Sequence, residues 1–492
     1  MSQSKRIYSL ILAMLLTGST MLSCGDGDDR ASDSTDSADT AASNAAEDTA
    51  ASVDDGKLPS GLPEMDLEGY TATFFGKNII GITAEDLDGE IVNDAVYNRN
   101  AALSEKYNFN IEYVISANAE KPIVDVMQTV LAGDDDYQVL LDGGNRFTGF
   151  IQSNLMYDMN ELKYQDYTKP WWIENLNHGI SLRGKLYMSV SSFMLPAFTA
   201  AYHPFVNADL AADLDVDVDA LYQAARDGKW TIDRLIELTK IGSADLNGDG
   251  VMDHTDRWSF QSPAYGAYTL AVGAGFQIAK KDENDEPYFS IVSGESIDLW
   301  DKLCGQIYSD RANFLGTQHI TGTDIWAAQY NIYKEGRALV FINVLDNAMR
   351  DYTYHYAILP SPKYDEEQEY YYHTASCWGT PMLGVPVTVQ DPDKVSFVLE
   401  AMAYASYYDV MPAFYQDYVE RKLVRDEESV EMLKIIHNSM FFDAGSLYNW
   451  GALVELAGQL AIDGKNDLVT KFAAVEKKAE AEMKAMMDSI GD

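Results

Sequence analysis

The chain has 492 residues, of which 47% are hydrophobic, and its formal net charge is −41. This acidic excess argues against nucleic-acid binding and against binding to anionic bilayers, because both need clusters of Lys and Arg. About 430 residues follow the amino-terminal segments described next, which is enough for two or three structural units with a large core.

Residues 1–24 are organised like an export leader. Lys5 and Arg6 precede a mainly apolar run at 7–16 that is too short to span a bilayer. The segment around Cys24, MLSCG, resembles a bacterial lipoprotein processing site. We therefore predict that Cys24 carries a lipid, with an uncleaved anchor or simple secretion as the alternatives.

Residues 25–65 are predicted to form a tether. Within 25–60 there are ten acidic residues, two basic residues and no aromatic residue. Such a segment cannot bury a core, so we expect it to be disordered and extended. A lipid at one end and a globular body at the other would hold the body on the extracytoplasmic face of the cell membrane.

From residue 70 onward, predicted strands alternate with predicted helices. Strands are expected at 70–75, 109–113 and 137–141, and helices at 90–107 and 122–133. This order indicates an α/β fold with a largely parallel sheet. Because ligands bind beyond the carboxyl ends of such strands, the loop at 141–146 with Asp142 is a candidate binding loop.

A helix is predicted after Thr231, a possible N-cap, and an acidic loop follows it. The loop has the Asp-x-Asn-x-Asp-Gly register of a calcium site, and all its side-chain donors are hard oxygens. Turns rich in Asp, Asn and Gly also form without an ion, so a solvated turn is the alternative. The predicted ligands of a structural Ca²⁺ are Asp245, Asn247, Asp249, Val251, Asp253 and Asp256.

The carboxyl-terminal part is predicted to be helical. Asp391 and Pro392 form an N-cap and first-turn pair, and residues 468–487 are rich in Ala, Lys, Glu and Met. We expect the last helix to be docked and frayed only at 489–492.

Three cysteines are present, and Cys24 is assigned to the lipid. Cys304 and Cys377 lie far apart in sequence. Buried free thiols are the default expectation, and a disulfide is the alternative.

Five further stretches follow one another in the chain: GKLYMSV (184–190), YHPFVNADL (202–210), KWTIDRLIEL (229–238), YKEGRALVFINVLDNA (333–348) and AILPSPKYDEEQEYYY (357–372). In this order they resemble the extracellular solute-binding proteins of ABC importers, family 1, which includes sugar and oligosaccharide receptors. A further stretch at 418–451 resembles a lipoprotein subgroup of that family, and a calcium loop after the helix also occurs in it.

The resemblance implies two α/β lobes joined by crossing strands, with the ligand in the cleft between them. Lobe 1 would comprise residues 66–188 and 373–408. Lobe 2 would comprise residues 189–372 and 409–492 with the carboxyl-terminal helices.

Sugar binding requires flat aromatic faces for C–H surfaces and carboxylates or amides for hydroxyl groups. Each aromatic candidate could instead belong to the core. The candidates by family position are Asp142, Trp171, Trp172, Tyr202, Tyr265, Tyr268, Asn343, Asp346, Trp378 and Trp450.

The expected function is that of a monomeric, non-catalytic receptor that hands a sugar or oligosaccharide to an ABC permease. A surface-tethered glycan hydrolase, a peptide receptor and a passive adhesin are the alternatives. The sequence contains no Gly-x-Ser-x-Gly, His-Glu-x-x-His or phosphate-loop motif, and its seven His residues lack ligand spacing. It also lacks the repeats that adhesins usually carry.

Overall fold

The computed structural model describes residues 56–491 except 119, 310–312 and 316–323. The leader, Cys24 and residues 25–55 of the predicted tether lie outside the described residues. In the described ranges, no helix combines the length and the apolar character that crossing a membrane would need.

The first sheet has the strand order β12-β3-β1-β2. Its parallel part is β1 (Tyr70–Gly76), which pairs with β2 (Phe109–Ile115) and β3 (Val139–Gly143). At the edge, β12 (Pro381–Gly384) runs antiparallel to β3. The predicted strands are confirmed here, whereas the antiparallel edge strand departs from the expected parallel order.

The second sheet has the order β10-β4-β9-β5-β8. Its strand β5 pairs in parallel with β9 and β8, while β4 is antiparallel to both of its neighbours, β9 and β10. The α/β prediction is therefore confirmed, but the expectation of a parallel sheet is wrong for β4. The bounds are β4 (His203–Asn207), β5 (Trp258–Ser262), β8 (Asn313–Leu315), β9 (Ala338–Asn343) and β10 (Tyr356–Ile358).

Two chain segments cross side by side between these sheets. Residues 200–203 lead into β4, and residues 373–376 lead toward β12. Ala201 and Ala375 form a bridge, and Ser376 N–H donates to the Ala200 carbonyl at 3.2 Å. Short paired strands accompany them: β11 (His373–Thr374) with β13 (Met440–Phe441), and the hairpin of β6 (Ala279–Lys281) and β7 (Pro287–Phe289).

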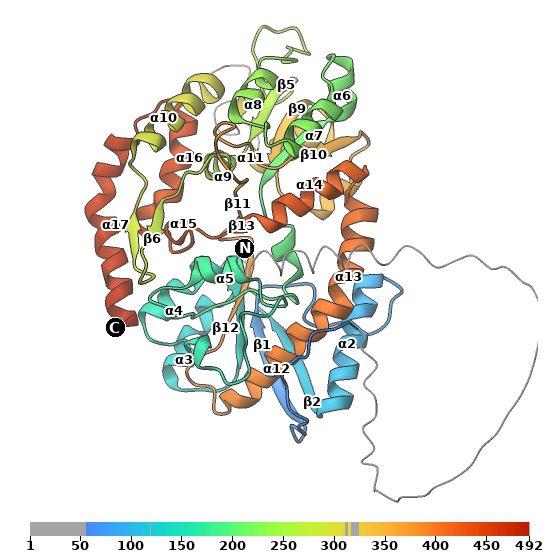
Figure 1. Cartoon of the computed structure of the whole chain (residues 1–492), viewed down its shortest axis with the longest axis vertical. Helices are drawn as coiled ribbons and strands as arrows, with labels where there is room; N and C mark the ends of the chain where they lie inside the picture. Colours follow the sequence, from blue (N-terminus) through green and yellow to red (C-terminus); the bar gives the residue numbers. More distant parts are fainter. Residues whose placement is uncertain (1–55, 119, 310–312, 316–323, 492) are drawn as a thin grey trace, which may run out of the picture. The chain divides into compact units, whose positions relative to one another are not determined.

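Helices pack on both sheets. In Figure 1, α2 and α12 lie beside β1 and β2, and the contacts of α12 with β1 and α2 agree. Helices α8 and α9 pack on strands of the second sheet. The helices are α2 (Ile91–Tyr107), α3 (Met127–Ala132), α4 (Thr148–Gln152), α5 (Glu174–Ile180), α6 (Ala208–Asp213), α7 (Val218–Arg226), α8 (Ile232–Thr239), α9 (Ala264–Gly273), α10 (Gly294–Leu303), α11 (Ile325–Lys334), α12 (Pro392–Ala405), α13 (Met411–Ala413), α14 (Glu427–Asn438), α15 (Ala444–Leu447), α16 (Leu453–Asp463) and α17 (Leu468–Ile490).

Helix ends test the predicted caps. Asp391 caps α12 as expected, because its carboxylate accepts the Lys394 N–H at 3.2 Å. Thr231 precedes α8, but its side chain makes no capping bond. Helix α17 continues to Ile490, whose side chain is buried, so the helix is docked through its last turn and the expected fraying is wrong for Ser489 and Ile490.

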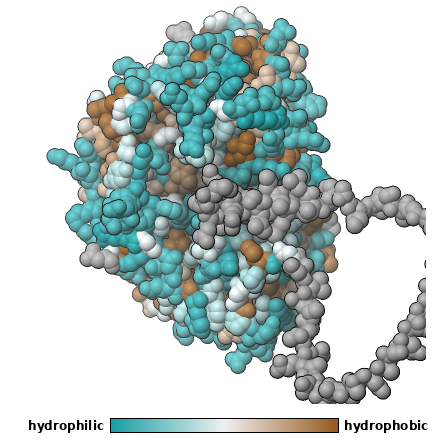
Figure 2. All heavy atoms as spheres, viewed as in Figure 1, coloured by the Kyte–Doolittle hydropathy of each residue, from teal (hydrophilic) through white to brown (hydrophobic). Residues whose placement is uncertain are grey.

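Other local features bear on the remaining expectations. Cys304 and Cys377 are buried and free, which confirms the default prediction. The end of the predicted tether contacts the body: Lys57 pairs with Asp409 at 3.2 Å, and Leu58 N–H donates to the Tyr408 hydroxyl. The face seen in Figure 2 is mostly hydrophilic, as expected from the net charge of −41.

Candidate functional site

Four of the predicted aromatic residues form one cluster. The ring centroid of Tyr265 lies 5.2 Å from Tyr202, 5.2 Å from Trp378 and 5.6 Å from Tyr268. Tyr202, Tyr265 and Trp378 are half-buried, whereas Tyr268 is fully buried beneath them. Residues far apart in the sequence therefore build an aromatic surface that is partly open to solvent.

The cluster sits where several strands end. Tyr265 follows the carboxyl end of β5, Tyr202 precedes β4, and Trp378 lies between the crossing segment 373–376 and β12. The end of β3 touches this segment, because a Cβ on Gly143 would lie 2.5 Å from the Trp378 carbonyl oxygen. Glycine at this position lets the two backbones approach. Lys77, which follows β1, reaches the same carbonyl with its Nζ at 3.5 Å.

A cavity of about 280 Å³ adjoins the cluster. Two predicted residues, Tyr202 and Asp346, line it. The sequence analysis missed other lining residues, among them Ile80, Thr199, Phe414 and Tyr418. Ile80 follows β1, so the rule that ligands bind at strand ends could have found it. Phe414 and Tyr418 lie on the π-helical segment Phe414–Leu423, which the sequence pattern did not indicate.

The phenols of this site are neutral at physiological pH, and burial moves their pKa values further upward. Burial, and after it the nearby carboxylate of Asp346, raises the pKa of Tyr202. Burial also raises the pKa of Tyr265 well above its ordinary value. Neutral hydroxyls can both donate and accept hydrogen bonds, and Asp346 adds a carboxylate acceptor. The site can therefore bind an uncharged, hydroxyl-rich solute against aromatic rings.

Solved structures resemble this chain closely enough to show its fold. A cyclo/maltodextrin-binding protein complexed with maltotetraose has a TM-score of 0.54 and 13% identity, covering 86% of this chain and 96% of its own. An ABC substrate-binding protein from Listeria monocytogenes in complex with cycloalternan has a TM-score of 0.53 and 12% identity, covering 86% and 99%. An ABC transporter solute-binding protein from Thermotoga lettingae bound with α-D-tagatose has a TM-score of 0.53 and 15% identity, covering 85% and 100%.

The fold is that of the two-lobed periplasmic binding proteins. These neighbours are binding proteins by description. At 12 to 15% identity the likeness extends to the fold alone. The sequence matches no protein-family model and no curated protein sequence, so the predicted family 1 subtype stays a prediction.

Trp171 and Trp172, predicted as ligand residues, lie in the core of this binding-protein fold. Both are 0% exposed, and their Nε1 groups donate to the two carboxylate oxygens of Glu400 on α12, each at 2.7 Å. Burial raises the pKa of Glu400 to about 7. The pair thus fixes the loop before α5 to α12 and presents no face to a solute.

Trp450 and Asp142, two further predicted ligand residues, are also buried and make contacts within the protein. Trp450 is 1% exposed and stacks on Tyr448, with centroids 5.4 Å apart. Asp142 is 4% exposed, and its carboxylate accepts the backbone N–H groups of Gly143 at 2.7 Å and Ile123 at 3.3 Å. Burial raises the pKa of Asp142. Its carboxylate therefore orders the end of β3, and it does not line the cavity beside the aromatic cluster.

Asn343 and Tyr268 take supporting positions. Asn343 ends β9, and its Oδ1 accepts the Val344 N–H at 2.9 Å, which shapes the turn that carries Asp346. The Tyr268 hydroxyl donates to the Asp443 carboxylate at 3.3 Å. Both residues thus lie close to the site and hold its walls.

The predicted calcium loop folds around its own acidic side chains. Asp245 accepts the N–H groups of Gly248 and Gly250, and Asp256 accepts those of Leu246 and Asp253. In the part of the chain that the structure describes, no group of three His, Cys, Asp or Glu residues converges on a metal position. The donors are hard oxygens that suit Ca²⁺, but the hydrogen bonds are those of an Asp-rich turn. Calcium binding stays a prediction.

Proposed function

We propose that the chain is an extracytoplasmic solute-binding protein that delivers a sugar or oligosaccharide to an ABC importer. The observation that carries the proposal is the half-buried cluster of Tyr202, Tyr265 and Trp378 at the strand ends, beside a cavity that Asp346 also lines. The binding-protein fold, shared with receptors solved with maltotetraose, cycloalternan and tagatose, supports the same ligand class.

The chemistry of the cluster suits a neutral sugar. Aromatic faces pack against the C–H surfaces of a pyranose, while Tyr202 and Asp346 bind its hydroxyl groups. The neutral phenols offer hydroxyl groups and aromatic faces, and no positive charge, to a ligand. A sugar binding here is held and released without bond cleavage.

Ligand capture requires a change in the population of lobe arrangements. A ligand favours closure only through contacts that it makes better in the closed state. The crossing segments 200–203 and 373–376 are the elements that absorb such a hinge motion, because they connect the two sheets. Tyr202 and Trp378 lie at their ends, so ligand contacts and hinge are coupled.

Membrane attachment and delivery complete the proposal. A diacylglycerol on Cys24 and the acidic segment 25–65 would hold the receptor near its permease. The leader pattern and the composition of the tether support this part of the proposal.

A thermal-shift screen against neutral glycans and peptides, with product analysis of every hit, tests the function. We expect a saturable rise in Tm with unchanged glycan, lost on Trp378→Ala. Trp326→Ala, which removes an exposed indole that does not line the cavity, is the matched control. Hydrolysis of a hit glycan by pure protein would establish an enzyme instead, and hits confined to peptides would overturn the substrate class.

A further inference from the structure

A second, larger cavity lies beyond the aromatic cluster, and Asp443, the partner of the Tyr268 hydroxyl, lines it. We call it the tyrosine groove: a cavity of about 1000 Å³ lined by Tyr288, Tyr370, Tyr371 and Tyr372 together with residues of α5 and of the segment 435–444. It shares no lining residue with the cavity beside Tyr202. Tyr372, just before the crossing segment 373–376, lines the groove, and Ser376, at the end of that segment, lines the other cavity, with buried residues between them.

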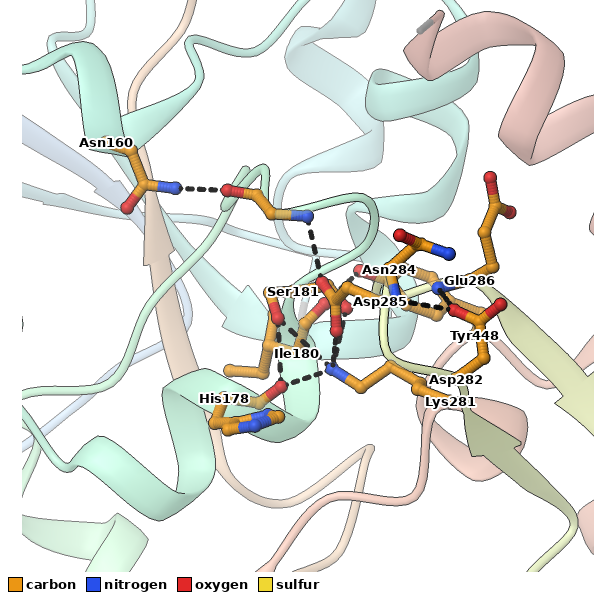
Figure 3. A network of polar contacts seen from close by, with 11 residues as sticks. Asn160, His178, Ile180, Ser181, Lys281, Asp282, Asn284, Asp285, Glu286 and Tyr448 are labelled. Carbon is orange, nitrogen blue, oxygen red and sulfur yellow. Dashed lines mark hydrogen bonds and ion pairs between the residues drawn. The ribbon is translucent and has the colours of Figure 1, made fainter.

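The groove is a built structure. Gly179 of α5 packs directly on the backbone of Phe442, because an added Cβ would lie 2.5 Å from the Phe442 carbonyl oxygen. At one end, Lys281 on β6 donates to the carbonyls of His178 and Ser181 and pairs with Asp285 at 2.6 Å (Figure 3). These contacts fix α5 against the β6–β7 hairpin. The walls are therefore held in place without a ligand.

Two tyrosine rings are offered to solvent in the groove. Tyr288 is 48% exposed and Tyr370 is 54% exposed. Tyr372 lies deeper and packs edge-on against Phe441, with centroids 6.1 Å apart. The exposed tyrosine rings provide apolar faces against which a pyranose ring can pack.

Unused hydrogen-bonding groups surround these rings. Among the described residues, no partner engages the side-chain polar groups of His178, Gln277, Asn438 or Tyr288. They supply neutral donors and acceptors that match hydroxyl groups. Figure 3 shows the His178 ring beside the Lys281 contacts but outside the network of dashed lines.

Charge favours a neutral ligand. The lining holds two lysines, Lys280 and Lys281, and two carboxylates, Glu369 and Asp443. This balance contrasts with a chain whose net charge is −41. Lys281 is already paired with Asp285, and Asp443 is buried and accepts backbone N–H groups, so the exposed charges of the lining are Lys280 and Glu369, which have opposite signs. An anion or a cation would therefore gain little net attraction from the groove.

We propose that the tyrosine groove is a second saccharide site, which binds a neutral oligosaccharide independently of the aromatic cluster. Its volume reaches the upper end of the range for small-molecule sites, about 300 to 1,000 Å³, and so admits more than one sugar unit. The proposal rests on the proposed function in its ligand class, a neutral sugar, but not in its site.

Isothermal titration of the purified full chain with a panel of neutral oligosaccharides, from disaccharides to hexasaccharides and including maltotetraose, tests the proposal. We expect two binding events for at least one panel member. The double variant Tyr288→Ala/Tyr370→Ala should weaken one event about tenfold or more, which corresponds to about 1.4 kcal/mol, and leave the other unchanged. Trp378→Ala should do the reverse. The matched pair Tyr288→Phe/Tyr370→Phe keeps the rings and should weaken the groove event less.

The outcomes separate the two proposals. A single event that is lost on Trp378→Ala and unaffected by the groove variants overturns the second site and leaves the proposed function intact. A single event lost only with the groove variants supports the groove and overturns the aromatic cluster as the sugar site. Binding of no panel member overturns the second site, and the thermal-shift screen against neutral glycans and peptides decides the proposed function separately. Circular dichroism of each variant verifies that the fold is retained.

Discussion

Glu400 tests whether Trp171 and Trp172 are structural. The substitution Glu400→Gln keeps the shape of the side chain but replaces one acceptor oxygen by an NH₂ group, which then faces an indole N–H. One buried hydrogen bond is lost and one buried donor is left unsatisfied, which costs about 1–3 kcal/mol. At pH 5, where the buried carboxyl of the native protein is protonated, we expect the variant to be less stable by about this amount.

The stability advantage of the native protein over Glu400→Gln becomes smaller as the pH rises. Burial raises the pKa of Glu400 from 4.5 to about 7, so the folded state holds its proton to higher pH than the unfolded state does. Stability from this group is full below about pH 4.5 and is lost as pH rises through about 7. Between pH 5 and pH 8 the loss is about 2–3 kcal/mol. Glutamine does not titrate, so the variant lacks this loss.

Urea unfolding followed by tryptophan fluorescence at both pH values gives the required numbers. The stability advantage of the native protein over Glu400→Gln should fall by about 2–3 kcal/mol from pH 5 to pH 8, and other titrating groups cancel in this difference. A difference that stays constant or grows with pH would refute the reasoning. It would mean that the two indole donors outweigh burial and hold the carboxylate ionised.

Three further predictions concern other parts of the chain. Chelator should lower the Tm of the native protein and leave the Tm of Asp249→Ala unchanged. The reason is that an ion bound only to the folded state, at a hundredfold excess over its Kd, adds about 2.7 kcal/mol of stability. An equal Tm with and without chelator favours the Asp-rich turn. Mass spectrometry of membrane-extracted protein should find diacylglycerol on Cys24, and an intact Met1 terminus would contradict this. Gly143→Ala should lower both the Tm and the sugar affinity, because its methyl group would press on the Trp378 carbonyl 2.5 Å away. A Gly143→Ala protein with native affinity would show that the contact does not position Trp378.

Patterns of consecutive residues were sufficient to predict several of the helices and strands. Strand β1 and helix α2 were predicted within one residue at each end, because alternation and helical periodicity are properties of consecutive residues. The Asp391 cap was predicted for the same reason, since a capping side chain bonds a backbone N–H three residues away. The fold class followed from the order of these elements along the chain.

Strand direction and burial were decided by contacts distant in sequence. The reversed β4 depends on which strands flank it, and these come from residues more than a hundred positions later. Trp171 and Trp378 are the same residue type, and each has an aromatic neighbour in sequence or in space. Trp171 is buried because Glu400, 229 residues away, accepts its N–H, whereas Trp378 stays half-exposed beside Tyr265. Hydrogen bonds and packing between such segments form only when the chain is folded. The sequence could therefore suggest both tryptophans as ligand residues, but only the tertiary structure decides which of them is buried in the core and which reaches the surface.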